Sequence, residues 1–163
     1  MSGDEPTIQE RAAQPYVAVA ATPTMATLGD AIPAGLDRVF GWLADHGIEP
    51  MGPPFVRYDV IDMDGELRIQ LGVPVETALA TDGLIAAELP AGRYASLTFT
   101  GPEDGVRANA ALLDWAAEQG LAIERWEEGA GEGFGARVEW LLDGPEDDPD
   151  PATWRTEVAI MLA

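Results

Sequence analysis

The chain has 163 residues, and 29 acidic side chains against 9 basic ones give it a formal net charge of −20. It contains no cysteine and no lysine, which excludes thiol catalysis, disulfides, thiolate zinc sites and Schiff-base chemistry. The strong negative charge repels polyanions and argues against direct binding of nucleic acid.

The N-terminal segment is acidic, where a secretory signal would be basic and then apolar. No apolar run approaches the roughly 18 residues that would suggest a membrane span. An apolar content of 47% is typical of a globular chain. We therefore expect a cytoplasmic protein with no membrane contact, a single domain over residues 1–163, either monomeric or dimeric.

The first predicted element is a strand over residues 7–20, followed by an amphipathic helix. In that helix Val39 and Leu43 recur at helical spacing, and Gly47 stands where a left-handed residue commonly ends a helix. Alternating apolar residues over 55–61 and 67–75 predict a β-hairpin, because the acidic, glycine-containing run between them favours a turn.

The second half of the chain repeats this order. Residues 83–100 predict a strand that splits in two at the turn 89–93, and a helix follows. Trp115 begins the run Trp-Ala-Ala-Glu-Gln-Gly, which matches the run Trp-Leu-Ala-Asp-His-Gly that begins at Trp42. Residues 136–142 and 154–162 predict the second hairpin, with a longer turn.

The predicted fold class is therefore α+β, with tandem β–α–β–β repeats at about residues 7–80 and 83–163. Two such repeats related by a pseudo-twofold axis would form curved antiparallel sheets with both helices on one side. A groove along that axis is the natural place for a ligand.

Glu139 lies in the middle of a strand that is otherwise mainly apolar. Strand alternation places it on the same face as Arg137 and opposite to Trp140. An unpaired buried charge is costly, so this carboxylate is either salt-bridged, for example to Arg137 or Arg155, or set at the floor of a pocket. Glu157 in the neighbouring strand is either solvated, paired with an arginine, or close enough to Glu139 to form an acid/base pair.

Aromatic side chains gather on the hairpins and in the segment before the second one. Flat aromatic walls stack on planar ligands and attract cations, although core packing is the alternative for each of them. Arg57 occupies the place in the first half that Glu139 occupies in the second, so the two halves are not chemically symmetric. The predicted ligand contacts are Trp126, Phe134, Trp140, Trp154, Phe55 and Arg57.

Four segments together carry a family resemblance: Phe55-Val-Arg-Tyr58, Leu89-Pro-Ala-Gly-Arg-Tyr94, Thr100-Gly-Pro-Glu-Asp-Gly105, and Val138-Glu-Trp-Leu with Trp154-Arg-Thr-Glu157. They resemble the GyrI-like small-molecule-binding superfamily, the effector-binding module also found in AraC-type and MerR-type multidrug regulators. The resemblance covers residues 7–163. It implies a cleft between two repeats, a central glutamate matched by Glu139, and bulky aromatic ligands that are often cationic.

A stand-alone subset of that superfamily consists of cyclopropanoid hydrolases, which open the strained ring of DNA-alkylating compounds by adding water. Similarity to this subset implies a metal-independent, cofactor-free hydrolase. It implies Glu139 or Glu157 as general base and Tyr58 as a hydrogen-bond donor. The alternatives are a non-catalytic multidrug-binding or sequestering protein and a protein–protein interaction module resembling gyrase inhibitors.

Overall fold

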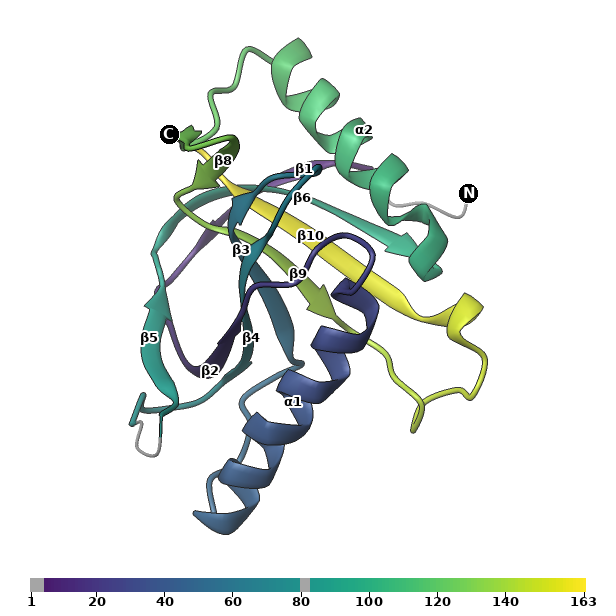
Figure 1. Cartoon of the computed structure of the whole chain (residues 1–163). Coiled ribbons are helices and arrows are strands. Elements are labelled where there is room, and N and C mark those ends of the chain that lie inside the picture. Colours follow the sequence, from purple (N-terminus) through teal and green to yellow (C-terminus); the bar gives the residue numbers. More distant parts are fainter. Residues whose placement is uncertain (1–4, 80–82) are drawn as a thin grey trace.

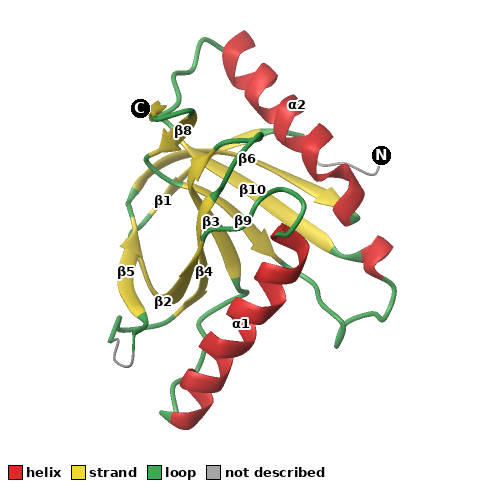
Figure 2. Ribbon diagram, viewed as in Figure 1, coloured by secondary structure: helices red, strands yellow, loops and turns green. Residues whose placement is uncertain are grey.

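The computed structural model describes residues 5–79 and 83–163, apart from the side chain of Pro102. Ala80, the expected end of the first repeat, lies outside the described residues. Within these residues, ten strands and two α-helices follow one another. Figures 1 and 2 show their arrangement in space. Their bounds are β1 Thr7–Arg11, β2 Gln14–Ala21, α1 Leu28–Asp45, β3 Phe55–Ile61, β4 Arg68–Pro74, β5 Ile85–Leu89, β6 Gly92–Thr100, α2 Gly105–Glu118, β7 Arg125–Glu128, β8 Gly131–Phe134, β9 Arg137–Leu141 and β10 Arg155–Met161.

The strands form one curled antiparallel sheet in the order β1-β6-β10-β9-β3-β4-β2-β5. This order is symmetric about the central pair β9–β3: β4, β2 and β5 follow β3 on one side, and β10, β6 and β1 follow β9 on the other. The first repeat is thus β2-α1-β3-β4 and the second is β6-α2-β9-β10. The predicted α+β fold with tandem β–α–β–β repeats is confirmed.

The two outer strands are exchanged between the repeats. β1 precedes the first repeat but pairs with β6 of the second, whereas β5 precedes the second repeat but pairs with β2 of the first. The prediction of one strand over residues 7–20 is therefore wrong, because the chain leaves the edge beside β6 after Arg11 and enters the other half at Gln14. The predicted split of the corresponding segment in the second half is confirmed.

The hairpin β7–β8, which the sequence pattern did not predict, has no counterpart among the described residues of the first half. Its strands are short and rich in glutamate and glycine, a composition more typical of a linker. β8 pairs with the end of β3 at Val60 and Ile61, and the indole of Trp126 lies against Gly133, where a Cβ would collide with it. Tertiary pairing, rather than strand propensity, therefore holds this hairpin in place.

Both helices cover the same face of the sheet. The register sets Val56 opposite Glu139 and Glu139 opposite Val158, so these side chains point to one face. On that face α1 packs with β2, β3 and β4 around Trp42, and α2 packs with β6 and β10 around Leu112. The opposite face carries a third cluster that is not covered by a helix.

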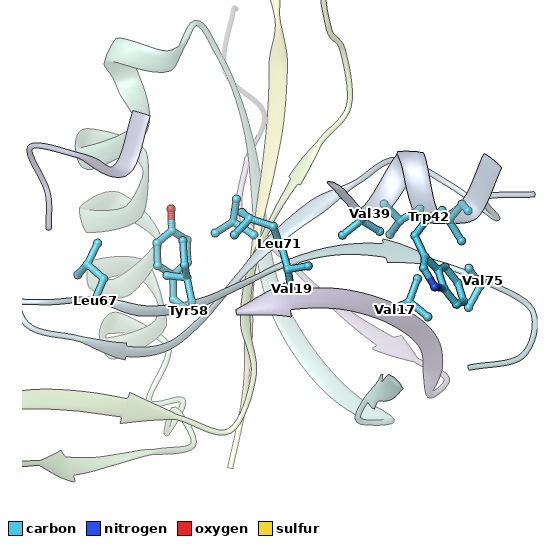
Figure 3. Packing of buried hydrophobic residues seen from close by; sticks show 12 residues of the cluster. Val17, Val19, Val39, Trp42, Tyr58, Leu67, Leu71 and Val75 are labelled. Carbon is cyan, nitrogen blue, oxygen red and sulfur yellow. The ribbon is translucent and has the colours of Figure 1, made fainter. Parts of the chain in front are cut away.

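Figure 3 shows the cluster under α1, with Trp42 and Val75 at one end and Tyr58 and Leu67 at the other. Tyr58 therefore stands where the core of the first half meets the second half. Its side chain is 9% exposed, the same fraction as that of Trp42.

The helices end as predicted from their glycines. Gly47 follows α1 with φ 65°, and Gly120 follows α2 with φ 71°, a conformation that is strained for residues with a Cβ. No helix in the described part of the chain is both long and apolar enough to cross a membrane.

Alanine substitutions at Gly35 and Gly41 test the packing of α1 on β4. Alanine favours a helix interior by about 1 kcal/mol over glycine, so G41A, whose new methyl group meets nothing within 4 Å, should be slightly more stable than the wild type. A Cβ at Gly35 would lie 2.7 Å from Cγ of the buried Leu71. We expect the free energy of unfolding of G35A to be lower than that of G41A by about 1–3 kcal/mol. Chemical denaturation measures the difference, and equal stabilities would contradict the helix–sheet contact.

Candidate functional site

A cavity of about 400 Å³ opens between the N-terminal parts of the two helices, above the central pair of strands. This volume lies within the range of about 300–1,000 Å³ that is common for small-molecule sites. A much smaller cavity of about 40 Å³ lies on the opposite face, beside Trp140. The residues that line the larger cavity are Met25, Leu28, Tyr58, Ile61, Met63, Leu67, Gly105, Val106, Asn109, Ala110, Leu113, Arg137 and Glu139.

The carboxylate of Glu139 is held at this cavity by two neutral donors. Tyr58 Oη donates to Glu139 Oε1 at 2.8 Å, and Asn109 Nδ2 donates to Glu139 Oε2 at 3.0 Å. Tyr58 reaches the carboxylate because it lies on the same face of β3 as Val56, which stands directly opposite Glu139. Asn109 reaches it from α2. The carboxylate is thus fixed from both halves of the molecule.

Arg137 belongs to the same network but reaches Glu139 only through Asn109. Its Nη2 donates to Asn109 Oδ1 at 2.9 Å, and its guanidinium lies 4.7 Å from the ring centre of Phe134. Among the ion pairs of the described residues, none includes Glu139, and Arg155 pairs with Asp143 at 2.8 Å. The salt bridge considered from the sequence is therefore replaced by a chain of hydrogen bonds.

Burial sets the protonation of the groups beside Glu139. Burial raises the pKa of Tyr58 well above its ordinary value, and the neighbouring Glu139 carboxylate raises it further. The phenol therefore stays neutral and keeps its proton as the donor to Glu139. Burial lowers the pKa of Arg137, while the charge of Glu139 opposes that effect. The guanidinium remains a cation at neutral pH.

Glu157 does not lie beside Glu139. The residue of β10 opposite Glu139 is Val158, whereas Glu157 stands opposite Trp140. Since neighbouring residues of a strand point to opposite faces, Glu157 projects to the face away from the cavity. There it forms an ion pair of 2.8 Å with Arg11. The two carboxylates do not form an acid/base pair, and the arginine-paired alternative describes Glu157.

Phe55, Arg57 and Trp140 also lie on the face away from the cavity, for the same reason of strand alternation. The rings of Phe55 and Trp140 lie 4.9 Å apart within the third cluster. Arg57 donates to Tyr16 Oη and to the carbonyl of Gly135, both at 3.0 Å. The structure thus places these three predicted ligand contacts on the sheet face that carries the third cluster and no helix.

The other predicted aromatic contacts do not line the cavity either. Phe134 is buried in the cluster under α2 and supports Arg137. Trp126 is 45% exposed on β7, and its Nε1 donates to Glu128. The indole of Trp154 donates to the carbonyl of Asp148 at 2.8 Å. Tyr58 and Glu139 are the predicted site residues that the structure brings together at the cavity.

Most residues that line the cavity were not among the predicted site residues, and Asn109, Met25 and Met63 are examples. Asn109 is the single asparagine of the chain and follows Ala108 on the apolar face of a predicted helix, which was an available signal. The methionines lie in or next to turns, where no periodic pattern marks them. The cavity wall is therefore built from thioether and aliphatic groups, with Tyr58 as its one aromatic ring among the described residues.

An apolar cleft between two repeats, with one carboxylate fixed at its floor, defines a small-molecule-binding domain. Residues 4–163 match the family model of the GyrI-like small molecule binding domain, and the chain belongs to this family. Comparison with curated proteins finds no match.

Solved structures show the same fold at low identity. The C-terminal domain of EcmrR superposes with a TM-score of 0.73 and 16% identity, covering 98% of this chain and 97% of that one. EcmrR in a complex with DNA superposes with a TM-score of 0.75 and 17% identity. That match covers 97% of this chain and 57% of the EcmrR chain. The protein SAV2435 bound to tetraphenylphosphonium superposes with a TM-score of 0.61 and 13% identity, covering 98% of this chain and 94% of that one. A protein described as a hydrolase from Listeria innocua superposes with a TM-score of 0.62 and 12% identity, covering 98% of this chain and 92% of that one.

Substitution of Tyr58 tests its raised pKa. Above about pH 10 the unfolded chain releases the phenolic proton while the folded protein retains it, so the free energy of unfolding should fall as the pH rises. In Y58F the free energy of unfolding should therefore fall less steeply with pH than in the wild type, by up to about 1.4 kcal/mol per pH unit. Part of the decline should remain, because the pKa values of Tyr16 and Tyr94 are also raised. Urea unfolding between about pH 8 and pH 11 measures the slopes, and identical slopes for Y58F and wild type would refute the assignment.

Proposed function

We propose that the cleft binds bulky aromatic cations and that Glu139 is their counter-ion. The observation that carries this proposal is the set of partners of Glu139: its two oxygens accept from neutral groups, Tyr58 and Asn109, and from no cation in an ion pair of the described residues. Neutral donors stabilise a carboxylate without cancelling its charge. A negative charge at the floor of an apolar cavity favours a cation that brings its own apolar surface.

The walls of the cavity suit ligands of differing shape. Met25 and Met63 are 39% and 57% exposed at the cavity, and their side chains have three rotatable bonds each. Unbranched, polarizable thioethers adapt to irregular apolar surfaces. The ring of Tyr58 adds an aromatic face that attracts cations. This combination supports binding of several related compounds rather than one.

Acidic residues adjoin the segments that line the cavity. Met63 stands between Asp62 and Asp64, and Glu103 and Asp104 precede Gly105 at the start of α2. With a net charge of −20, the chain has a field that attracts cations and repels anions. The structural neighbour SAV2435, which was solved bound to tetraphenylphosphonium, supports the same ligand class.

Tetraphenylphosphonium is the direct probe of this proposal. E139Q keeps the size of the side chain and removes its charge, and we expect the dissociation constant of tetraphenylphosphonium to rise about 10-fold to 100-fold. E157Q is the matched control, because Glu157 lies on the other face of the sheet, and its affinity should equal that of the wild type. Isothermal titration calorimetry measures both. Equal losses in the two variants, or no loss in E139Q, would show that Glu139 is not the counter-ion.

Hydrolysis of a cyclopropanoid compound is the second candidate function. The Tyr58–Glu139 pair supports it, since a carboxylate at a cavity can accept a proton from water while a neutral phenol positions the reactant. In this reaction the water oxygen bonds to a ring carbon, a strained C–C bond breaks, and its electron pair moves into the conjugated dienone. The released proton passes through Glu139 to the resulting phenolate oxygen, so that the product contains one additional water. The neighbour described as a hydrolase supports this candidate, and the family match supports binding alone.

Incubation with a cyclopropanoid alkylating agent separates the two functions. If the protein is a hydrolase, mass spectrometry should detect the compound with one water added, at a rate that E139Q lowers by about 10²–10⁴-fold and E157Q leaves unchanged. Turnover that survives E139Q would reject Glu139 as the general base. Absence of turnover in the wild type, with tetraphenylphosphonium still bound, would leave binding as the function.

A further inference from the structure

Two opposite charges reach the cavity from one strand. Arg137 and Glu139 both line it, and because they are two residues apart on β9 they point to the same face. A strand rises by about 3.4 Å per residue, so their Cα atoms lie roughly 7 Å apart. The cavity is therefore lined by one positive and one negative group, and the amide of Asn109 bonds to both of them.

The guanidinium of Arg137 has unused donors that remain accessible. An arginine side chain carries five N–H donors, and among the described residues Arg137 donates one hydrogen bond, from Nη2 to Asn109. None of its nitrogens is among the described buried nitrogens that lack a partner. These nitrogens are therefore not sealed in the interior without a partner, and Arg137 is one of the residues that line the cavity. The ring of Phe134, 4.7 Å away, supports the guanidinium from one side.

We propose that Arg137 makes the cleft selective for dipolar or zwitterionic aromatic compounds, by binding an acceptor oxygen of a ligand whose cationic end lies at Glu139. This inference rests on the proposed binding of aromatic cations. A charge-assisted hydrogen bond to a carboxylate or a polarised carbonyl is about twice as strong as one between neutral groups. For a cation without such an oxygen, the direct interaction with the Arg137 charge is repulsive. Arg137 therefore has opposite effects on the two kinds of ligand.

Three probes separate these effects: tetraphenylphosphonium, which has no acceptor oxygen; rhodamine 110, a cationic dye with a free carboxylate; and rhodamine 123, its methyl ester. R137M should weaken binding of rhodamine 110 by about 10-fold to 100-fold and that of rhodamine 123 clearly less. The same variant should bind tetraphenylphosphonium at least as tightly as the wild type. R107M is the matched control, because Arg107 is exposed on α2 next to the cavity residue Val106, and it should change none of the three affinities.

The change of sign between probes distinguishes recognition from a structural role. If R137M weakens all three ligands equally, Arg137 only supports the shape of the cleft and the inference is overturned. The inference is also overturned if R137M leaves the ratio of the rhodamine 110 and rhodamine 123 affinities unchanged, or if the wild type binds neither dye. Both results leave the site for tetraphenylphosphonium intact. Failure of the wild type to bind tetraphenylphosphonium removes the proposed function itself, and this inference with it.

Discussion

The pairing of β3 with β9 is the contact on which the rest of the site depends. It joins the two repeats into one sheet and sets Val56 opposite Glu139, so that Tyr58 reaches the carboxylate. A shift of one residue would turn every side chain of β9 to the other face. Glu139 would then enter an apolar cluster, and Trp140 would enter the cleft. Burial of apolar residues on both faces holds the register, and the register in turn positions the charged groups.

The electrostatics of the cleft follow from how Glu139 is satisfied. A carboxylate taken out of water needs donors, and a cationic donor would neutralise it. Here a phenol from the first repeat and an amide from α2 meet that need without adding charge. Asn109 also accepts from Arg137, so a single amide separates the two ions while bonding to both. The result is a pair of opposite charges that are held in place and are both turned toward the cavity.

The order of the elements could be predicted because it is encoded locally. Helical spacing, the repeated tryptophan and the glycines at positions 47 and 120 mark the same units in both halves, and the structure has them at those places. The β7–β8 hairpin could not be predicted in this way, since its glutamate- and glycine-rich strands gain their place by pairing with β3. The exchange of β1 and β5 is likewise a contact between distant segments.

The site was predictable in part for a related reason. Strand alternation correctly separated Glu139 from Trp140 on β9, although Trp140 was still predicted as a ligand contact and packs on the other face. It did not indicate which face of β3 or β10 meets which face of β9, because that depends on the register between strands. Glu157, Phe55 and Arg57 were therefore assigned to the cleft although the register turns them away from it. A lone asparagine next to the apolar face of a helix marks Asn109 in the sequence, but its bond to Glu139 depends on how α2 packs on the sheet, which no pattern within the helix contains.

The exchanged outer strands have a mechanical consequence. Each repeat donates an edge strand to the other, and the sheet runs without interruption through the central pair. The two halves therefore cannot rotate apart like the lobes of a hinged binding protein without breaking ladder hydrogen bonds. Adaptation to a ligand is left to side chains such as those of Met25 and Met63. Rotamer changes of exposed side chains take picoseconds to nanoseconds, whereas domain hinges take microseconds to milliseconds. Ligand entry into this cleft should therefore require no opening of the sheet.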